Sequence, residues 1–157
     1  MYCFYAILTV FFVLADILTK KAVVSNMKLH ESLPVIKDVF HITYVRNTGA
    51  AWSIFAGKTS VLGVVSAVVV VAALIFIVIK KPKNKVLIAS LSMIIGGGIG
   101  NMIDRFSLGY VIDFLDFKLI NFPVFNVADI FVVCGATLLI LYMLFEEKFE
   151  NADKTHS

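Results

Sequence analysis

Two aspartates in the C-terminal half of the chain have surroundings in which an isolated carboxylate is costly. Asp113 lies in the apolar stretch 111–115 with no adjacent cation, and Asp129 lies between Ala128 and Ile130. A carboxylate in apolar surroundings must find a partner or take up a proton. The economical arrangement is a shared proton, with one carboxylate ionised and the other neutral. Such a pair can activate water and polarise a carbonyl group, as an aspartic hydrolase does.

The two aspartates also fit two other roles. Carboxylates at membrane depth can form a proton or ion pathway, and they can form a purely structural polar pair. A pathway would need further polar groups on the cytoplasmic side, and the sequence offers few of them. On the residue pattern alone, all three interpretations stay open.

Further polar residues lie within or beside apolar stretches, where they are expensive. Asp16 and Lys20 stand at positions i and i+4, the spacing of an ion pair at a helix end. Asp104 and Arg105 are adjacent and have the pattern of an interfacial ion pair. Asn126 has the position of a helix N-cap. These residues therefore have structural interpretations as well as functional ones.

The composition indicates what kind of molecule must position these side chains. The chain has 157 residues, of which 60% are hydrophobic and 16% are charged, and its mean hydropathy is +0.93. A soluble domain is about 45–50% apolar and about 25% charged. A soluble globule of this size could not hide so much apolar surface in one core. The sequence therefore predicts a small integral membrane protein and excludes a disordered, collagen-like or coiled-coil chain.

Four apolar runs are long enough to cross a bilayer as helices. They cover residues 2–18, 59–79, 86–103 and 127–145, with approximate ends. The first run lacks the basic region and the A-x-A site of a cleaved signal peptide, so we expect it to be retained. In the third run Gly96 and Gly100 have GxxxG spacing, which predicts close packing between helices.

The distribution of lysines predicts the orientation of the spans. Four lysines crowd the link between the second and third runs, at positions 80, 81, 83 and 85. Dense positive charge in a short loop is typical of the cytoplasmic side. Both termini would then be cytoplasmic, and residues 33–57 and 106–125 would form an extracytoplasmic platform.

The platform has the pattern of a small β structure. Residues 39–45 alternate between two faces and are rich in β-branched and aromatic types, which predicts a strand. Residues 33–36 would pair with it, and 110–125 would add short strands. Trp52 suits the membrane interface, and this part of the platform is a candidate lid. We expect an all-α membrane protein with four transmembrane helices and a small extracytoplasmic β subdomain, forming one domain over residues 1–157.

Other chemistries have weaker support in the sequence. The histidines at 30, 41 and 156 lie outside the apolar runs, and the two cysteines do not have the spacing of a zinc site. We therefore expect no metal and no cofactor. The basic cluster is explained by membrane topology, so we expect no nucleic-acid partner.

Five motifs occur in order along the chain. They are DILTK at 16–20, RNTGAA at 46–51, GGIGNMIDR at 97–105, VIDF at 111–114 and FPVFNVAD at 122–129. Together they resemble the motifs of lipoprotein signal peptidase, or signal peptidase II, a family of aspartyl proteases of bacterial membranes. The resemblance covers almost the whole chain. Ile130 is a mild departure, because a smaller residue is more usual there.

The resemblance implies an activity and a set of site residues. Asp113 and Asp129 would be the catalytic dyad. The residues that would support the dyad and the substrate are Asp16, Lys20, Asn47, Gly49, Asn101, Arg105, Asn126 and Ala128. The enzyme would cut prolipoproteins before a lipobox cysteine that carries diacylglycerol. It would lie in the bacterial cytoplasmic membrane in contact with lipid, with its site near the outer face, and would bind globomycin-like inhibitors. We further expect a monomer.

Overall fold

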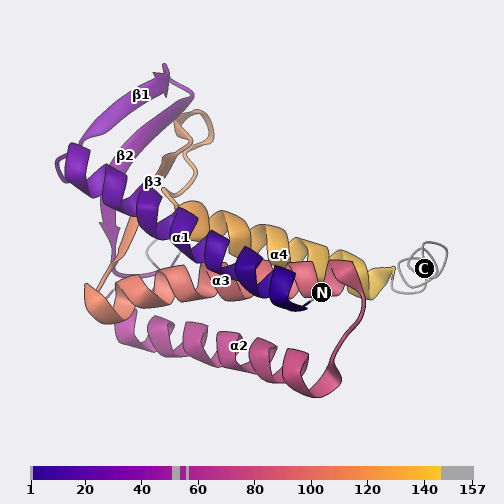
Figure 1. Ribbon diagram of the computed structural model, residues 1–157. Coiled ribbons are helices and arrows are strands. Elements are labelled where there is room, and N and C mark those ends of the chain that lie inside the picture. Colours follow the sequence, from indigo (N-terminus) through magenta and orange to yellow (C-terminus); the bar gives the residue numbers. More distant parts are fainter. Residues whose placement is uncertain (1, 51–53, 56, 146–157) are drawn as a thin grey trace.

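Four long helices make up most of the computed structural model, which describes residues 2–50, 54–55 and 57–145 (Figure 1). The helices are α1 (Tyr2–Asn26), α2 (Thr59–Lys80), α3 (Lys85–Ser107) and α4 (Val127–Leu144). Each is long and apolar enough to cross a bilayer. The chain is therefore a multi-pass membrane protein, as its composition predicts.

Helix α3 lies at the centre of the bundle and packs against the other three helices (Figure 1). In the most apolar stretch of α3, 56% of the residues are buried. In the corresponding stretches of α1, α2 and α4, only 11–17% of the residues are buried. The outer helices thus present most of their apolar side chains outward. Such surfaces suit lipid, because lipid tails are as apolar as leucine.

Glycines of α3 allow its neighbours to approach closely. A Cβ atom at Gly97 would overlap the carbonyl oxygen of Ala128 on α4. At Gly96 it would lie 2.7 Å from Cβ of Phe12 on α1, and at Gly100 it would lie 2.5 Å from Oδ2 of Asp16. The predicted role of the GxxxG spacing in helix packing is confirmed.

A three-stranded antiparallel sheet stands at one end of the bundle (Figure 1). Its strands are β1 (Ser32–Ile36), β2 (Phe40–Asn47) and β3 (Val111–Asp116), in that spatial order. The predicted pairing of the first two strands is confirmed. The segment after residue 110 contributes β3, a bridge between Leu115 and Phe125, and the short 3₁₀ helix η2 (Lys118–Ile120).

The sheet is anchored to the bundle by a small apolar cluster. Val23 of α1 packs with Tyr44 of β2 and with Ile112 and Phe114 of β3. Helix α1 continues to Asn26 instead of ending near residue 18, and its last turns run beneath the sheet (Figure 1). Asp16 and Lys20 therefore lie within the helix and not at its end.

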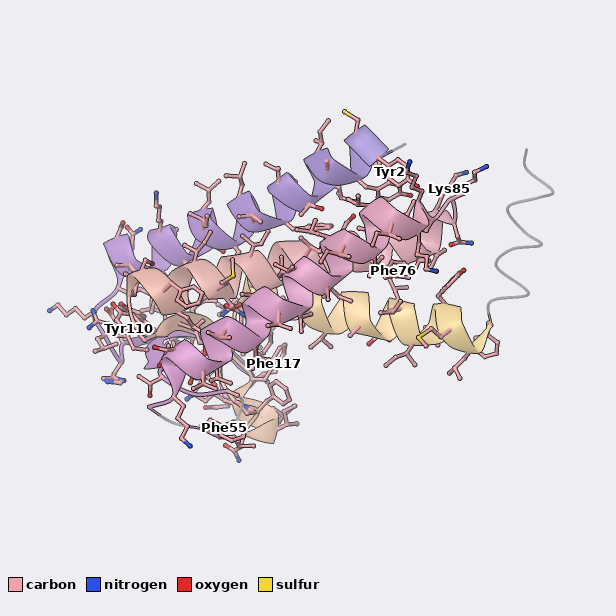
Figure 2. The ribbon with its side chains drawn as sticks, turned by 90° about the horizontal axis from the view of Figure 1, so that it is seen from below. Tyr2, Phe55, Phe76, Lys85, Tyr110 and Phe117 are labelled. Atoms are coloured by element: carbon pink, nitrogen blue, oxygen red, sulfur yellow. The ribbon has the colours of Figure 1, made fainter. Side chains whose placement is uncertain are left out.

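The two ends of the bundle differ in character. Tyr2 and Lys85 lie at one end of the bundle, whereas Tyr110 lies at the other (Figure 2). At the first end the Tyr2 hydroxyl donates a hydrogen bond of 2.6 Å to the carbonyl oxygen of Pro82 in the lysine-rich link. The lysine cluster and the sheet are therefore at opposite ends. Trp52, on which the lid hypothesis depends, falls outside the described residues.

Candidate active site

Asp113 lies in the middle of β3 and is 2% exposed. The register of the sheet places it opposite Val45 of β2. Its Oδ2 accepts a hydrogen bond of 2.9 Å from Nδ2 of Asn47, and its Oδ1 accepts one of 2.7 Å from Nδ2 of Asn126. Two amide donors from different elements therefore fix both oxygens of this carboxyl group.

Asp129 lies in the first turn of α4, where the helix start fixes its orientation. Its Oδ2 accepts a hydrogen bond of 3.1 Å from the backbone N–H of Asn126. In return, Oδ1 of Asn126 accepts one of 2.9 Å from the backbone N–H of Asp129. This reciprocal pair is a capping box, so the predicted N-cap role of Asn126 is confirmed. Nδ2 of Asn101 donates to Oδ1 of Asp129 at 2.7 Å.

Asn126 connects the two aspartates within one buried network. Its side chain is fully buried and donates to Asp113, while its backbone donates to Asp129. The same amide nitrogen also donates to Oδ1 of Asn101 at 2.9 Å. Because Asn101 donates in turn to Asp129, the two carboxyl groups share their hydrogen-bonding neighbours.

A buried cluster of one cation and two carboxylates supports this network. Nζ of Lys20 lies 2.7 Å from Oδ2 of Asp16 and 2.9 Å from Oδ2 of Asp104, and it donates to Oδ1 of Asn101 at 3.0 Å. The predicted i,i+4 ion pair of Asp16 with Lys20 is confirmed, but its predicted place at a helix end is wrong, because the two residues are 0% and 2% exposed and lie within α1. The predicted pair of Asp104 with Arg105 is also wrong, because Asp104 faces Lys20 across the α1–α3 contact.

The same two carboxylates connect four elements in two pairs. Oδ1 of Asp16 accepts a hydrogen bond of 3.0 Å from the backbone N–H of Ala128, at the start of α4. Oδ2 of Asp104 accepts one of 3.1 Å from the backbone N–H of Ile112, next to Asp113. Helix α1 is thereby fixed to α4, and α3 is fixed to β3. Each tie ends beside a candidate catalytic aspartate.

A cavity of about 480 Å³ opens over the two aspartates. Both line it, together with Asn47 and Arg105. Nε of Arg105 is buried and has no hydrogen-bond partner among the described residues. The cavity continues along α4, where its lining is largely apolar; these residues are Ile130, Val133 and Cys134. A volume of this size suits a small ligand or a short peptide segment.

A second cavity of about 350 Å³ meets the first at Asp113. The two share Asn47 and Asp113, and the second is also lined by Thr48 and Asn121. Gly49 lies nearby, and its backbone N–H donates to Oδ1 of Asn47 at 2.9 Å, which orients that amide toward Asp113. The site thus has one apolar arm and one more polar arm, with a candidate catalytic carboxyl group at their junction.

Burial first, and then the negative charge of the neighbouring Asp129, raises the pKa of Asp113 to about 7. The hydrogen bonds from Asn47 and Asn126 act in the opposite direction. Near neutral pH, Asp113 therefore exchanges between its protonated and ionised forms. This is the condition under which one member of a carboxyl pair can donate a proton while the other accepts one.

The structure places the eight predicted supporting residues around Asp113 and Asp129. Sequence reasoning missed Val133 and Cys134, which line the apolar arm. The sequence could have predicted them, because they lie three and four residues beyond Ile130 and therefore share its face of the helix. Among the residues that the structure describes, no three His, Cys, Asp or Glu side chains gather as a metal site.

The chain is similar to known proteins along most of its length. A family model described as signal peptidase (SPase) II matches residues 8–145. A lipoprotein signal peptidase of Halothermothrix orenii is 48% identical, with 87% of this chain and 92% of the relative covered. One of Caldanaerobacter subterraneus subsp. tengcongensis is 47% identical, with 89% and 95% covered.

Two solved structures resemble the fold of this chain. A bacterial membrane enzyme determined by the in meso method at 2.3 Å superposes with a TM-score of 0.84 and 33% identity. The match covers 89% of this chain and 87% of that one. A second such structure, at 1.9 Å, has a TM-score of 0.81 and 33% identity, with 90% and 92% covered.

Proposed function

Because the chain belongs to the signal peptidase II family and is an aspartic-type peptidase of that family, we propose that Asp113 and Asp129 are its catalytic pair. In this proposal the enzyme removes the signal peptide from prolipoproteins. It cuts the peptide bond before a lipobox cysteine that carries diacylglycerol. One observation carries the proposal: two carboxyl groups line a single cavity and are joined through Asn126.

The reaction needs one ionised and one neutral carboxyl group. The ionised group takes a proton from a water molecule, whose oxygen attacks the carbonyl carbon of the scissile bond. The neutral group protonates the carbonyl oxygen as the tetrahedral intermediate forms. When the intermediate collapses, the C–N bond breaks and the nitrogen of the cysteine takes the proton that the first carboxyl group removed from water. A hydroxyl of the intermediate returns a proton to the second carboxylate, so the pair again has one ionised and one neutral member. The products are a new carboxylate on the signal peptide and a free amine on the lipoprotein.

The raised pKa of Asp113 supports this division of roles. The two groups titrate as a pair, so the proton belongs to the pair. Asn101 and Asn126 present their amide N–H groups to the carboxylates and fix the distance between the two side chains. Lys20, Asp16 and Asp104 act as positioning residues, since they hold Asn101 and the elements that carry the aspartates.

The two arms of the site suggest how a substrate lies. The apolar arm along α4 would take the signal-peptide side of the scissile bond, because its lining matches apolar side chains. The polar arm would take the lipoprotein side. Extended backbone at membrane depth is tolerated only where protein or water satisfies its polar groups. Arg105, with its buried Nε unpaired among the described residues, would offer such a donor to a substrate carbonyl.

Orientation and partners follow from the same proposal. The sheet end of the bundle would face the outside of the cytoplasmic membrane, and the lysine-rich link at the other end would face the cytoplasm. The enzyme would act as a monomer in contact with membrane lipid. Globomycin-like cyclic peptides would inhibit it by occupying the cavity over Asp113 and Asp129.

Cleavage of a diacylglyceryl-modified lipobox peptide by the purified protein tests the proposal. We expect cleavage before the modified cysteine, located by mass spectrometry. We expect Asp113→Asn and Asp129→Asn each to lose activity by a factor of at least about 10³ while remaining folded. Asp116→Asn is the matched control, because Asp116 lies on the same strand but does not line the cavity. Full activity in either of the first two variants would remove that aspartate from the mechanism.

A further inference from the structure

A third cavity, also of about 480 Å³, lies on the α1–α3 side of the sheet end; it has no lining residue in common with the first cavity and shares only Arg46 with the second. We propose that it binds the phosphate group of an anionic membrane lipid. The residues that carry this inference are Lys21 on α1, Arg46 on β2 and Tyr110 after α3. It does not depend on the proposed catalytic pair.

Arg46 is positioned by two aromatic side chains. Its guanidinium carbon lies 4.7 Å from the ring centroid of Tyr110 and 5.9 Å from that of Tyr44. Its Nε donates a hydrogen bond of 3.2 Å to the hydroxyl of Tyr44. Among the described residues, no carboxylate forms an ion pair with it. An arginine that is held by aromatic rings while its terminal amino groups are not engaged by an acid is suited to bind a phosphate.

The charge balance of the cavity is positive. Its charged lining residues are three cations, Lys20, Lys21 and Arg46, and one acid, Asp104. Asp104 already pairs with Lys20 and accepts from the backbone of Ile112. Lys20 is also engaged by Asp16, so this buried cluster has no positive charge to offer. The two cations that form no ion pair within the described part of the chain, Lys21 and Arg46, are therefore left to attract an anion.

The surroundings of these cations favour a lipid over a soluble anion. Ile17 of α1 and Ile103 of α3 supply an apolar wall of the same cavity, farther from the sheet end than Lys21, and Val24 adds apolar lining nearer the sheet. Both helices cross the membrane, and the cavity lies where they reach the sheet. A phosphate held there by Lys21 and Arg46 would sit at headgroup level, and acyl chains would run along the apolar wall. Basic pockets between membrane helices on the cytoplasmic side bind anionic lipid headgroups, and the same charge complementarity applies at the sheet end.

The experiment measures lipid binding to the purified full-length protein in neutral detergent by native mass spectrometry. Phosphatidylglycerol is titrated against phosphatidylcholine of the same acyl chains. We expect phosphatidylglycerol to bind at least about fivefold more tightly, and Lys21→Gln and Arg46→Gln each to remove about fivefold. Lys28→Gln changes the charge equally at a residue that does not line the cavity, and should leave binding unchanged.

Further arms of the experiment test source and folding. Inorganic phosphate at millimolar concentration should fail to displace the lipid, because it cannot use the apolar wall. Equal binding of the two lipids, displacement by phosphate, or an equal loss in Lys28→Gln would overturn the proposal. Lys21 is exposed on the helix surface, so Lys21→Gln tests the site even if Arg46→Gln fails to fold. Cleavage measured in lipid-free detergent reports on the catalytic pair separately, so failure of one proposal is distinguishable from failure of the other.

Discussion

The protein should lose stability as pH rises from 5 to 7 because of Asp113. In the unfolded chain an aspartate has a pKa near 3.8, whereas in the folded protein burial first, and then the charge of Asp129, raises the pKa of Asp113 to about 7. Across this pH range the folded state binds a proton that the unfolded state has released. The free energy of unfolding therefore falls with rising pH. The contribution is fully present below pH 3.8 and is lost as pH rises through 7.

The size of this effect follows from the two pKa values. Each pH unit is worth about 1.4 kcal/mol for one full proton, but half of the folded molecules have released it by pH 7, so the interval from pH 5 to pH 7 accounts for about 2 kcal/mol. Asp113→Asn removes the titrating group and should remove this slope. The hydrogen bonds from Asn47 and Asn126 are also altered in the variant, but that change does not depend on pH. The comparison is therefore made between pH values within each protein.

The assay is unfolding by titration with sodium dodecyl sulfate in neutral-detergent micelles, followed by circular dichroism at pH 5, 6, 7 and 8. Asp116→Asn is the control, because Asp116 is a buried aspartate of the same strand. Burial raises its pKa, but hydrogen bonds from Lys118 and Thr43 outweigh burial and hold the pKa below its ordinary value. Asp116→Asn should therefore keep the wild-type slope between pH 5 and pH 7. An unchanged slope in Asp113→Asn would refute the reasoning.

Three further predictions concern the supporting structure. Lys20→Met leaves two buried carboxylates without their cation and should lower the free energy of unfolding by about 3–5 kcal/mol. Lys21→Met, on the exposed side of the same helix, should change that free energy little. Equal losses for the two variants in denaturant titrations would contradict the buried cluster. Gly97→Ala should prevent α4 from approaching α3 and should lower the melting temperature and the cleavage rate together; a fully active, stable variant would argue against that contact. Alkylation of Cys134 with a bulky maleimide should block cleavage because this thiol lines the cavity, while alkylation of Cys3, at the far end of α1, should not; the comparison uses the two single Cys→Ser variants.

Much of the fold could be predicted because the bilayer restricts the choices. Each apolar run must form a helix to satisfy its backbone, so composition and length identify the spans. The alternation in residues 39–45 predicted a strand correctly, because one face of that strand packs on the apolar cluster and the other does not. The capping box at Asn126 was visible locally, because Asp129 follows it by three residues.

Local spacing indicates the ion pair of Asp16 with Lys20, but not its burial or the second carboxylate that Lys20 binds. Asp104 is adjacent to Arg105 in sequence, yet its cation is Lys20, far away in the chain. Adjacent residues on a helix point in different directions, so neighbours in sequence are poor candidates for an ion pair. Asp16 and Lys20 have the spacing of a surface pair, but the close approach of Gly100 on α3 places them inside the bundle. Such pairings depend on how helices are arranged around α3.

The central claim is that Asp113 and Asp129 work as a pair that holds one proton. Its most direct test is the pH dependence of kcat/KM for cleavage of the diacylglyceryl-modified lipobox peptide. The profile should be bell-shaped, because activity needs one ionised and one neutral carboxyl group. The decline on the alkaline side should have its midpoint near pH 7, where Asp113 loses its proton. A value of kcat/KM that stays constant from pH 5 to pH 9 would contradict the account.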